Sequence, residues 1–178
     1  MPSLATKKSP SSTTKSTRSA APAQVRIIGG QWKRTPLPVI TLEGLRPTPD
    51  RVRETVFNWL THLFDGHWQR VHCLDLFAGS GALGFEAASR GAAHVSLVES
   101  DARACHQMQS NKEKLKAEQI TVLRGDALLQ AARLLKMQQQ FQLIFVDPPY
   151  QSPVYASAMQ ACASLLSADG FIYLELPA

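Results

Sequence analysis

The feature that most constrains this chain is a regular alternation of apolar segments and helical patterns after residue 70. The pattern predicts strands at 71–76, 94–99, 120–124, 141–147 and 170–176, separated by helices at 82–90, 101–116, 126–137 and 153–166. Strands that are apolar throughout and alternate with helices form parallel sheets covered on both faces. We therefore expect an α/β fold built from right-handed βαβ units.

The residues before this core have a different composition. Residues 1–24 are rich in Ser, Thr, Lys and Pro and hold almost no large apolar side chain, so we expect a disordered basic tail, with a transit peptide as the weaker interpretation. Residues 25–64 indicate a small hairpin around Gly29–Gly30 and then a helix, for which Thr48 is a candidate N-cap. Its expected buried face consists of Val52, Val56, Trp59, Leu60 and Leu63. We expect one domain over 25–178, in which 70–178 form the cofactor-binding core.

Positive charge is concentrated at the front of the chain. Residues 1–53 carry ten Lys and Arg against two acids, or +8, while residues 54–178 carry nine against twelve, or −3, which together give the net charge of +5. This asymmetry indicates a polyanionic partner that is engaged from one side, although for 1–24 a solubilising tail explains the charge equally well.

The three cysteines have no CxxC spacing, and the five histidines form no metal-ligand pattern. No apolar run approaches the ~20 residues of a membrane span. We therefore expect a cytoplasmic protein without a metal site or a membrane segment.

A glycine-rich loop follows the first core strand, with the sequence Asp75-Leu-Phe-Ala-Gly79-Ser-Gly81-Ala-Leu-Gly84. Glu99 ends the next strand, where a carboxylate can accept both hydrogen bonds of a ribose diol. Asp126 follows the third strand and can either accept from an adenine amino group or cap the next helix. A dinucleotide or S-adenosylmethionine would fit this arrangement. The anionic Asp75 beside the loop favours S-adenosylmethionine, which has no phosphate and carries a positive sulfonium.

The fourth strand ends in Asp147-Pro148-Pro149-Tyr150. Ligands of open parallel sheets bind at the carboxyl ends of the strands, so Asp147 is expected in the same crevice as Gly79 and Glu99. A carboxylate and a proline carbonyl can accept both N–H bonds of one exocyclic amino group, and Tyr150 offers a flat face for a base. This motif indicates a nucleobase amino group as the substrate.

The Asp-Pro-Pro-Tyr turn and the glycine loop resemble class I S-adenosylmethionine-dependent amino-methyltransferases. With Arg26-Ile-Ile-Gly-Gly-Gln-Trp-Lys33 and Leu45-Arg-Pro-Thr-Pro-Asp-Arg-Val-Arg-Glu-Thr-Val-Phe-Asn-Trp-Leu60, the chain resembles the bacterial ribosomal RNA small-subunit methyltransferase D family. The resemblance implies a Rossmann-like sheet and methylation of the N2 amino group of guanine 966 in 16S ribosomal RNA, within a small-subunit assembly particle. Such folds usually finish with an antiparallel hairpin, which we expect to be missing here because the chain stops at Pro177-Ala178.

The resemblance also implies roles for individual residues. The catalytic group that would hold the guanine is Asp147, Pro148, Pro149 and Tyr150. Cofactor contacts are expected from Asp75, Phe77, Ala78, Gly79, Ser80, Gly81, Glu99, Asp126, Ala127, Arg46 and Thr48. The RNA-binding group is Arg26, Lys33, Arg34, Arg51 and Arg53.

Three other functions remain open at this point. A DNA adenine or cytosine amino-methyltransferase shares the chemistry of the Asp-Pro-Pro-Tyr turn. A nicotinamide-dependent dehydrogenase would explain the glycine loop and Glu99, but not Asp147. An inactive, truncated RNA-binding remnant would explain the abrupt end of the chain.

Overall fold

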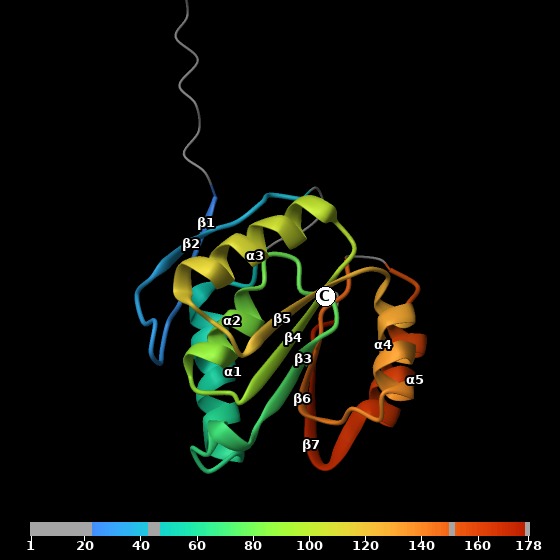
Figure 1. Cartoon of the computed structure of the whole chain (residues 1–178). Helices are drawn as coiled ribbons and strands as arrows, with labels where there is room; N and C mark the ends of the chain where they lie inside the picture. Colours follow the sequence, from blue (N-terminus) through green and yellow to red (C-terminus); the bar gives the residue numbers. More distant parts are fainter. Residues whose placement is uncertain (1–22, 43–46, 150–151, 177–178) are drawn as a thin grey trace, which may run out of the picture.

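A five-stranded parallel sheet forms the centre of the molecule, with helices on both of its faces (Figure 1). The computed structural model describes residues 23–42, 47–149 and 152–176. The strand order is β5-β4-β3-β6-β7, and a separate antiparallel pair joins β1 to β2. The strands are β1 (Gln24–Arg26), β2 (Pro36–Pro38), β3 (His72–Asp75), β4 (His94–Glu99), β5 (Ile120–Arg124), β6 (Phe141–Val146) and β7 (Leu166–Leu174). The α-helices are α1 (Asp50–Leu63), α2 (Ala82–Ser89), α3 (Ala102–Leu115), α4 (Ala127–Lys136) and α5 (Tyr155–Leu165), and a 3₁₀ turn spans Trp68–Arg70. The predicted α/β fold is confirmed.

Each central strand is apolar on both sides because it packs into two separate cores. Cys73 and Phe145 face the core formed with α1, α2, α3 and the hairpin. Leu74 and Ile144 face the core formed with α4 and α5. Successive side chains of a strand point to opposite faces, so a continuous apolar run satisfies both layers.

The sequence predicted the bounds of the middle strands better than those of the last one. The expected strands at 94–99 and 120–124 agree with β4 and β5. The last strand was expected at 170–176, but β7 begins at Leu166, directly after α5, and its pairing with β6 shifts register between Phe141 and Leu143. Because β7 already ends at Leu174, Glu175 lies beyond the strand, at its carboxyl end.

The predicted buried face of α1 was wrong in part. Val56 and Leu60 are buried, but they share their face with Arg53 and Phe57, whereas Val52, Trp59 and Leu63 are 42%, 66% and 50% exposed. The predicted face was selected from apolar residue types at helical spacing, so it could not include an arginine. The predicted N-cap was also wrong, since Pro49 occupies that position and no side chain caps the helix.

A buried ion-pair cluster around Glu86 fixes the hairpin and α1 to α2. The Glu86 carboxylate accepts hydrogen bonds from the backbone N–H groups of Ile28 at 2.8 Å and Gly29 at 2.9 Å. Arg90 Nε donates to it at 3.0 Å, and Arg53 Nη1 lies 3.7 Å away. Removing one partner from such a buried cluster typically costs ~3–5 kcal/mol.

Arg53 was predicted to face RNA, and the structure contradicts this. The side chain is 1% exposed and donates to the Arg26 carbonyl oxygen at 2.9 Å and to Asp50 at 2.6 Å. A guanidinium that is desolvated among these partners is unavailable to a phosphate.

Glycine is required where the hairpin meets the end of α2. Gly30 has φ +76°, and a Cβ there would collide with the Ser89 carbonyl oxygen. That oxygen accepts from Gln31 N–H at 2.7 Å, while Ser89 Oγ donates to the Gly29 carbonyl oxygen at 2.6 Å. The hairpin is therefore held as a fixed part of the domain.

The expected tail over 1–24 falls almost wholly outside the described residues, although Gln24 already belongs to β1. In the part of the chain that the structure describes, no helix has the length and apolar character needed to span a membrane.

Candidate active site

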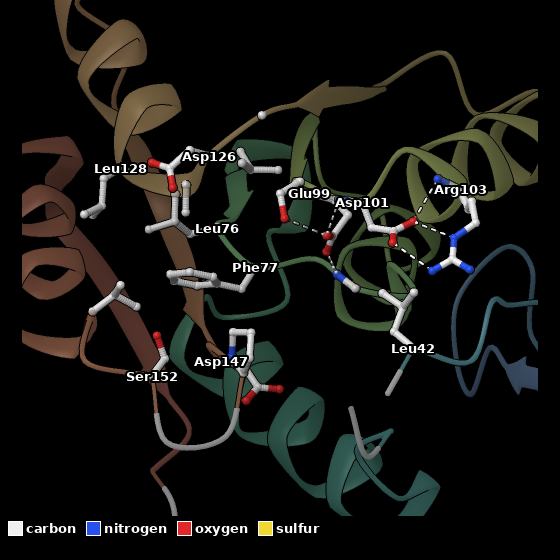
Figure 2. A pocket seen from close by; sticks show the side chains of 17 residues that line it. Leu42, Leu76, Phe77, Glu99, Asp101, Arg103, Asp126, Leu128, Asp147 and Ser152 are labelled. Atoms are coloured by element: carbon white, nitrogen blue, oxygen red, sulfur yellow. Dashed lines mark hydrogen bonds and ion pairs between the residues drawn. The ribbon is translucent and has the colours of Figure 1, made fainter. Parts of the chain in front are cut away.

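Two adjoining cavities lie at the carboxyl ends of the strands. The larger has a volume of about 440 Å³ and the smaller about 130 Å³. Leu42, Phe77, Gly79 and Asp147 line both of them. In Figure 2 the Phe77 ring lies between Asp126 and Asp147, and Glu99 lies to the right of them in this view. The structure thus brings together the loop, Glu99 and Asp147, as expected for the carboxyl ends of parallel strands, and Asp126 lies with them.

The loop after β3 is shaped by its glycines. Gly81 forms the left-handed N-cap of α2 with φ +81°, and its N–H donates to the Ala78 carbonyl oxygen at 2.7 Å. A Cβ at Gly84 would collide with Leu97 on β4, so this glycine lets α2 pack closely on the sheet. Phe77, Ala78, Gly79 and Ser80 line the smaller cavity, whereas Gly81 shapes the turn without lining either cavity.

Glu99 holds this loop at the end of β4. Its Oε2 accepts from Gly79 N–H at 2.8 Å, and its Oε1 accepts from Asp101 N–H at 2.8 Å (Figure 2). Oε1 also accepts from Ser100 Oγ at 3.4 Å, whereas Oε2 accepts only one of these bonds and keeps a lone pair for a ligand in the larger cavity.

Asp126 caps a helix and also lines a cavity, so the structure leaves a contact with a ligand possible beside the cap. It caps α4, with Oδ1 accepting from Leu129 N–H at 3.0 Å. It also lines the larger cavity together with Ala127 and Leu128. One carboxylate can cap the helix with one oxygen and accept from a ligand with the other.

Asp75 is the most unusual group in the site. It is 1% exposed, its Oδ1 has no hydrogen-bond partner among the described residues, and it lines the smaller cavity. Burial, and then the negative charges of Asp147 and Glu99, raise the pKa of Asp75 to about 8. A buried acceptor of this kind is suited to a ligand that brings a cationic donor.

Asp147 is half-buried and lines both cavities. Burial, followed by the charge of Glu175, raises the pKa of Asp147 to about 6. Pro148 is buried, and Pro149 lines the larger cavity. Tyr150, the fourth predicted catalytic residue, lies outside the described residues.

Residues 39–42, 47 and 48, which follow the hairpin, line the smaller cavity. Thr48 lines that cavity and donates from Oγ1 to Glu175 Oε2 at 3.4 Å. The Pro38 carbonyl oxygen accepts from Asn111 Nδ2 at 2.9 Å, which ties β2 to α3. Arg46, also predicted to contact the cofactor, lies outside the described residues.

Sequence reasoning missed Leu42 and Glu175. No motif distinguishes Leu42. Glu175 could have been found by the rule that pointed to Asp147, because it too follows a strand of the parallel sheet. It was hidden because the predicted last strand ran to residue 176.

Four of the five predicted RNA-binding residues are exposed: Arg26, Lys33, Arg34 and Arg51, with Arg53 as the exception. They come from the hairpin and from the first turn of α1. These elements pack on the sheet face opposite to α4 and α5. Within the described residues, no group of three or more His, Cys, Asp or Glu side chains has an arrangement that could hold a metal ion.

Comparisons with known proteins agree with this geometry. A family model described as "Conserved hypothetical protein 95" matches residues 25–178. The ribosomal RNA small subunit methyltransferase D of Escherichia coli is 41% identical over 154 residues, which cover 85% of this chain and 74% of that protein. The Haemophilus influenzae protein of the same name is 40% identical over 159 residues, covering 87% of this chain and 80% of that protein. A hypothetical protein from Thermus thermophilus has a similar solved structure, with a TM-score of 0.75, 32% identity and coverage of 84% of both chains.

The buried Asp75 makes a testable prediction about stability. In the folded chain this group stays protonated up to about pH 8, whereas an unfolded Asp ionises near pH 4. The folded state binds the extra proton in this window, so the Asp75 contribution lowers stability progressively as pH rises from about 4 to 8. Asp75→Asn removes the titration, and its stability relative to the wild type should increase over the same window, by at most ~1.4 kcal/mol per pH unit.

Urea unfolding of the wild type and the variant at pH 5.0, 7.0 and 8.5 measures this difference. Asp169→Asn, an exposed Asp on β7, is the matched control and should follow the wild type. Parallel pH profiles for the wild type and Asp75→Asn would contradict the assignment.

Proposed function

The chain belongs to the ribosomal RNA small subunit methyltransferase D family, and from that premise we propose that it methylates the N2 amino group of guanine 966 in 16S ribosomal RNA. The methyl donor in this proposal is S-adenosylmethionine. The observation that carries the proposal is that Asp147 and Gly79 line the same two cavities. The group that would hold a base amino group thus lies beside the loop that would hold the donor.

The residues of both cavities fit S-adenosylmethionine. Asp75, with its unpartnered buried oxygen, would accept from the ammonium group of the methionine part in the smaller cavity, beside Gly79, Ser80 and Thr48. Glu99 would accept from the ribose hydroxyls, and Asp126 with Ala127 would hold the adenine in the larger cavity. When bound, S-adenosylmethionine supplies an electrophilic methyl group.

The charge of the site favours this donor over a dinucleotide. Glu99 and Asp126 line the larger cavity, Asp147 lines both, and Asp75 lines the smaller one. With its pKa of about 8, Asp75 is mostly protonated in the free protein and becomes a further negative charge only beside a cationic ligand. The one Lys or Arg among the described lining residues is Arg103, which pairs with Asp101 at 3.0 Å. Carboxylates repel a pyrophosphate, whereas they stabilise a ligand with a sulfonium and an ammonium group.

Asp147 would do most of the chemistry. The N2 lone pair of guanine is delocalised into the ring, so the amino group is a weak nucleophile. Asp147 and the Pro148 carbonyl would accept its two N–H bonds and orient the lone pair toward the methyl group. Asp147 would then take the proton that the methylated nitrogen loses. With a pKa of about 6, Asp147 is ionised at neutral pH and still more basic than an ordinary Asp.

RNA would approach from the side of the hairpin. The exposed Arg26, Lys33, Arg34 and Arg51 would contact phosphates around the target, and the guanine would leave its stack to reach Asp147. A small-subunit assembly particle in the cytoplasm is the proposed setting. Tyr150 is proposed as the stacking partner of the base.

The first prediction from the proposed function concerns Asp147. Asp147→Ala should lower kcat for methyl transfer at least ~100-fold, because the acceptor and base are lost, while S-adenosylmethionine affinity changes little. The assay uses radiolabelled S-adenosylmethionine with unmethylated small-subunit RNA, both naked and assembled with its proteins, and mass spectrometry to locate the methyl group. Asp169→Ala is the matched control. Near-normal turnover of Asp147→Ala, or methylation by the wild type at another position, would contradict the proposal.

The second prediction concerns the basic hairpin. Lys33→Ala combined with Arg34→Ala should weaken RNA binding and reduce the slope of log K against log salt by about 1.4–1.8, because two phosphate contacts are lost. Filter binding at several salt concentrations measures the slope. Arg133→Ala with Lys136→Ala on α4, which packs on the other sheet face, is the control. If both double variants keep the wild-type slope, the hairpin does not contact RNA.

A further inference from the structure

A second carboxylate lies beside Asp147 at the end of the neighbouring strand. Val146 pairs with Leu174 in the parallel register, and Glu175 N–H donates to the Val146 carbonyl oxygen at 3.0 Å. Asp147 and Glu175 are the next residues of these two strands, so they leave the sheet next to each other. Thr48 Oγ1 donates to Glu175 Oε2 at 3.4 Å, which orients the Glu175 carboxylate from the side of the smaller cavity.

The two carboxylates are near enough to act on the same groups. Beyond the effect of burial, the charge of Glu175 raises the pKa of Asp147, and both charges raise the pKa of Tyr173 and of Tyr155. The four ion pairs found within the described residues involve other acids, namely Asp50, Glu86 and Asp101. Asp75, buried and with an unpartnered oxygen, lines the smaller cavity with Thr48 and Asp147 and independently indicates that this region receives a ligand with hydrogen-bond donors.

Only one of the three bases with an exocyclic amino group presents donors to both carboxylates. In guanine the ring nitrogen next to the amino group, N1, carries a hydrogen, so N2 and N1 form an adjacent pair of donors. In adenine and cytosine the ring nitrogen next to the amino group is an unprotonated acceptor. Because a carboxylate can only accept, a second one beside the amino-binding Asp147 attracts guanine and repels the other two bases.

We propose that Glu175 is a specificity-determining residue that accepts a hydrogen bond from guanine N1–H while Asp147 and the Pro148 carbonyl hold the N2 amino group. This inference rests on the proposed function and adds the group that selects guanine. Asp147-Pro148-Pro149 by itself suits any conjugated amino group, so selection among bases requires a residue outside that motif. Glu175 comes from a different strand and acts on a different atom of the base.

A purely structural role for Glu175 makes a different prediction. If its carboxylate served only to hold Thr48, its replacement would affect all base substrates by the same factor. Discrimination between bases that differ at N1 is therefore the diagnostic readout.

The experiment compares guanine with 2-aminopurine, which keeps the N2 amino group but has an unprotonated N1. Small-subunit RNA with either base at position 966 is prepared by ligation and assayed naked and after assembly with its proteins. The wild type should prefer guanine by about 10- to 100-fold in kcat/KM. In Glu175→Gln the amide N–H can donate to N1 of 2-aminopurine, so the preference should fall at least about tenfold. Because 2-aminopurine also lacks O6, the wild type and Glu175→Gln both lose any contact with that atom. This loss cancels when the guanine preferences of the two proteins are compared.

Two controls make the outcome decisive. Glu118→Gln, an exposed glutamate before β5, should keep the wild-type preference. S-adenosylmethionine affinity measured by titration should be unchanged in Glu175→Gln.

If the wild type is active and Glu175→Gln keeps its guanine preference, the proposed role of Glu175 is wrong. The proposed function is not affected by that result. A wild type that methylates no guanine in either form of the RNA would instead overturn the proposed function, and this inference with it.

Discussion

The site depends on a group of carboxylates whose burial and mutual repulsion destabilise the free protein. Asp75 is buried with an unpartnered oxygen, between the negative charges of Asp147 and Glu99, and its pKa is raised to about 8 as a result. Such burial costs stability unless a ligand supplies compensating charge or donors. The smaller cavity, which Asp75 lines, therefore suits a positively charged ligand, in agreement with the proposed sulfonium donor and with a base that presents N–H groups.

The fold explains how these acids come together although they are far apart in the sequence. Parallel strands end at the same edge of the sheet, and β4, β3, β6 and β7 are neighbours there. The buried Glu86 cluster then fixes the hairpin on α2, and β2 is tied to α3 through Asn111. From this fixed hairpin the chain continues past Leu42 and Thr48, which line the cavities. The hairpin and α1 thus carry both Arg53, which belongs to the buried ion-pair cluster, and the exposed side chains that are proposed to bind RNA.

Much of the fold could be predicted because strand and helix periods are local properties. The parallel sheet and the glycine turn followed from residues 70–178, and the meeting of Glu99, Asp126 and Asp147 followed from the topology. The errors arose where tertiary partners override local pattern. Arg53 looked like a surface cation, but its burial depends on Glu86, 33 positions later in the chain. Glu175 was hidden because apolar residues on both sides of it, Leu174 and Leu176, extend the apparent strand. Neither error is visible without the packing.

Calorimetric titration of the full chain with S-adenosylmethionine tests the central claim most directly, when repeated at pH 7 in buffers of different ionisation enthalpy. With a pKa of about 8 Asp75 is mostly protonated in the free protein, and it should ionise when it meets the ammonium group of the ligand. The account predicts binding with release of close to one proton, and binding of the Asp75→Asn variant that is weaker and releases none from this position. Binding of NADH with no binding of S-adenosylmethionine, or equal proton release by the wild type and the variant, would contradict it.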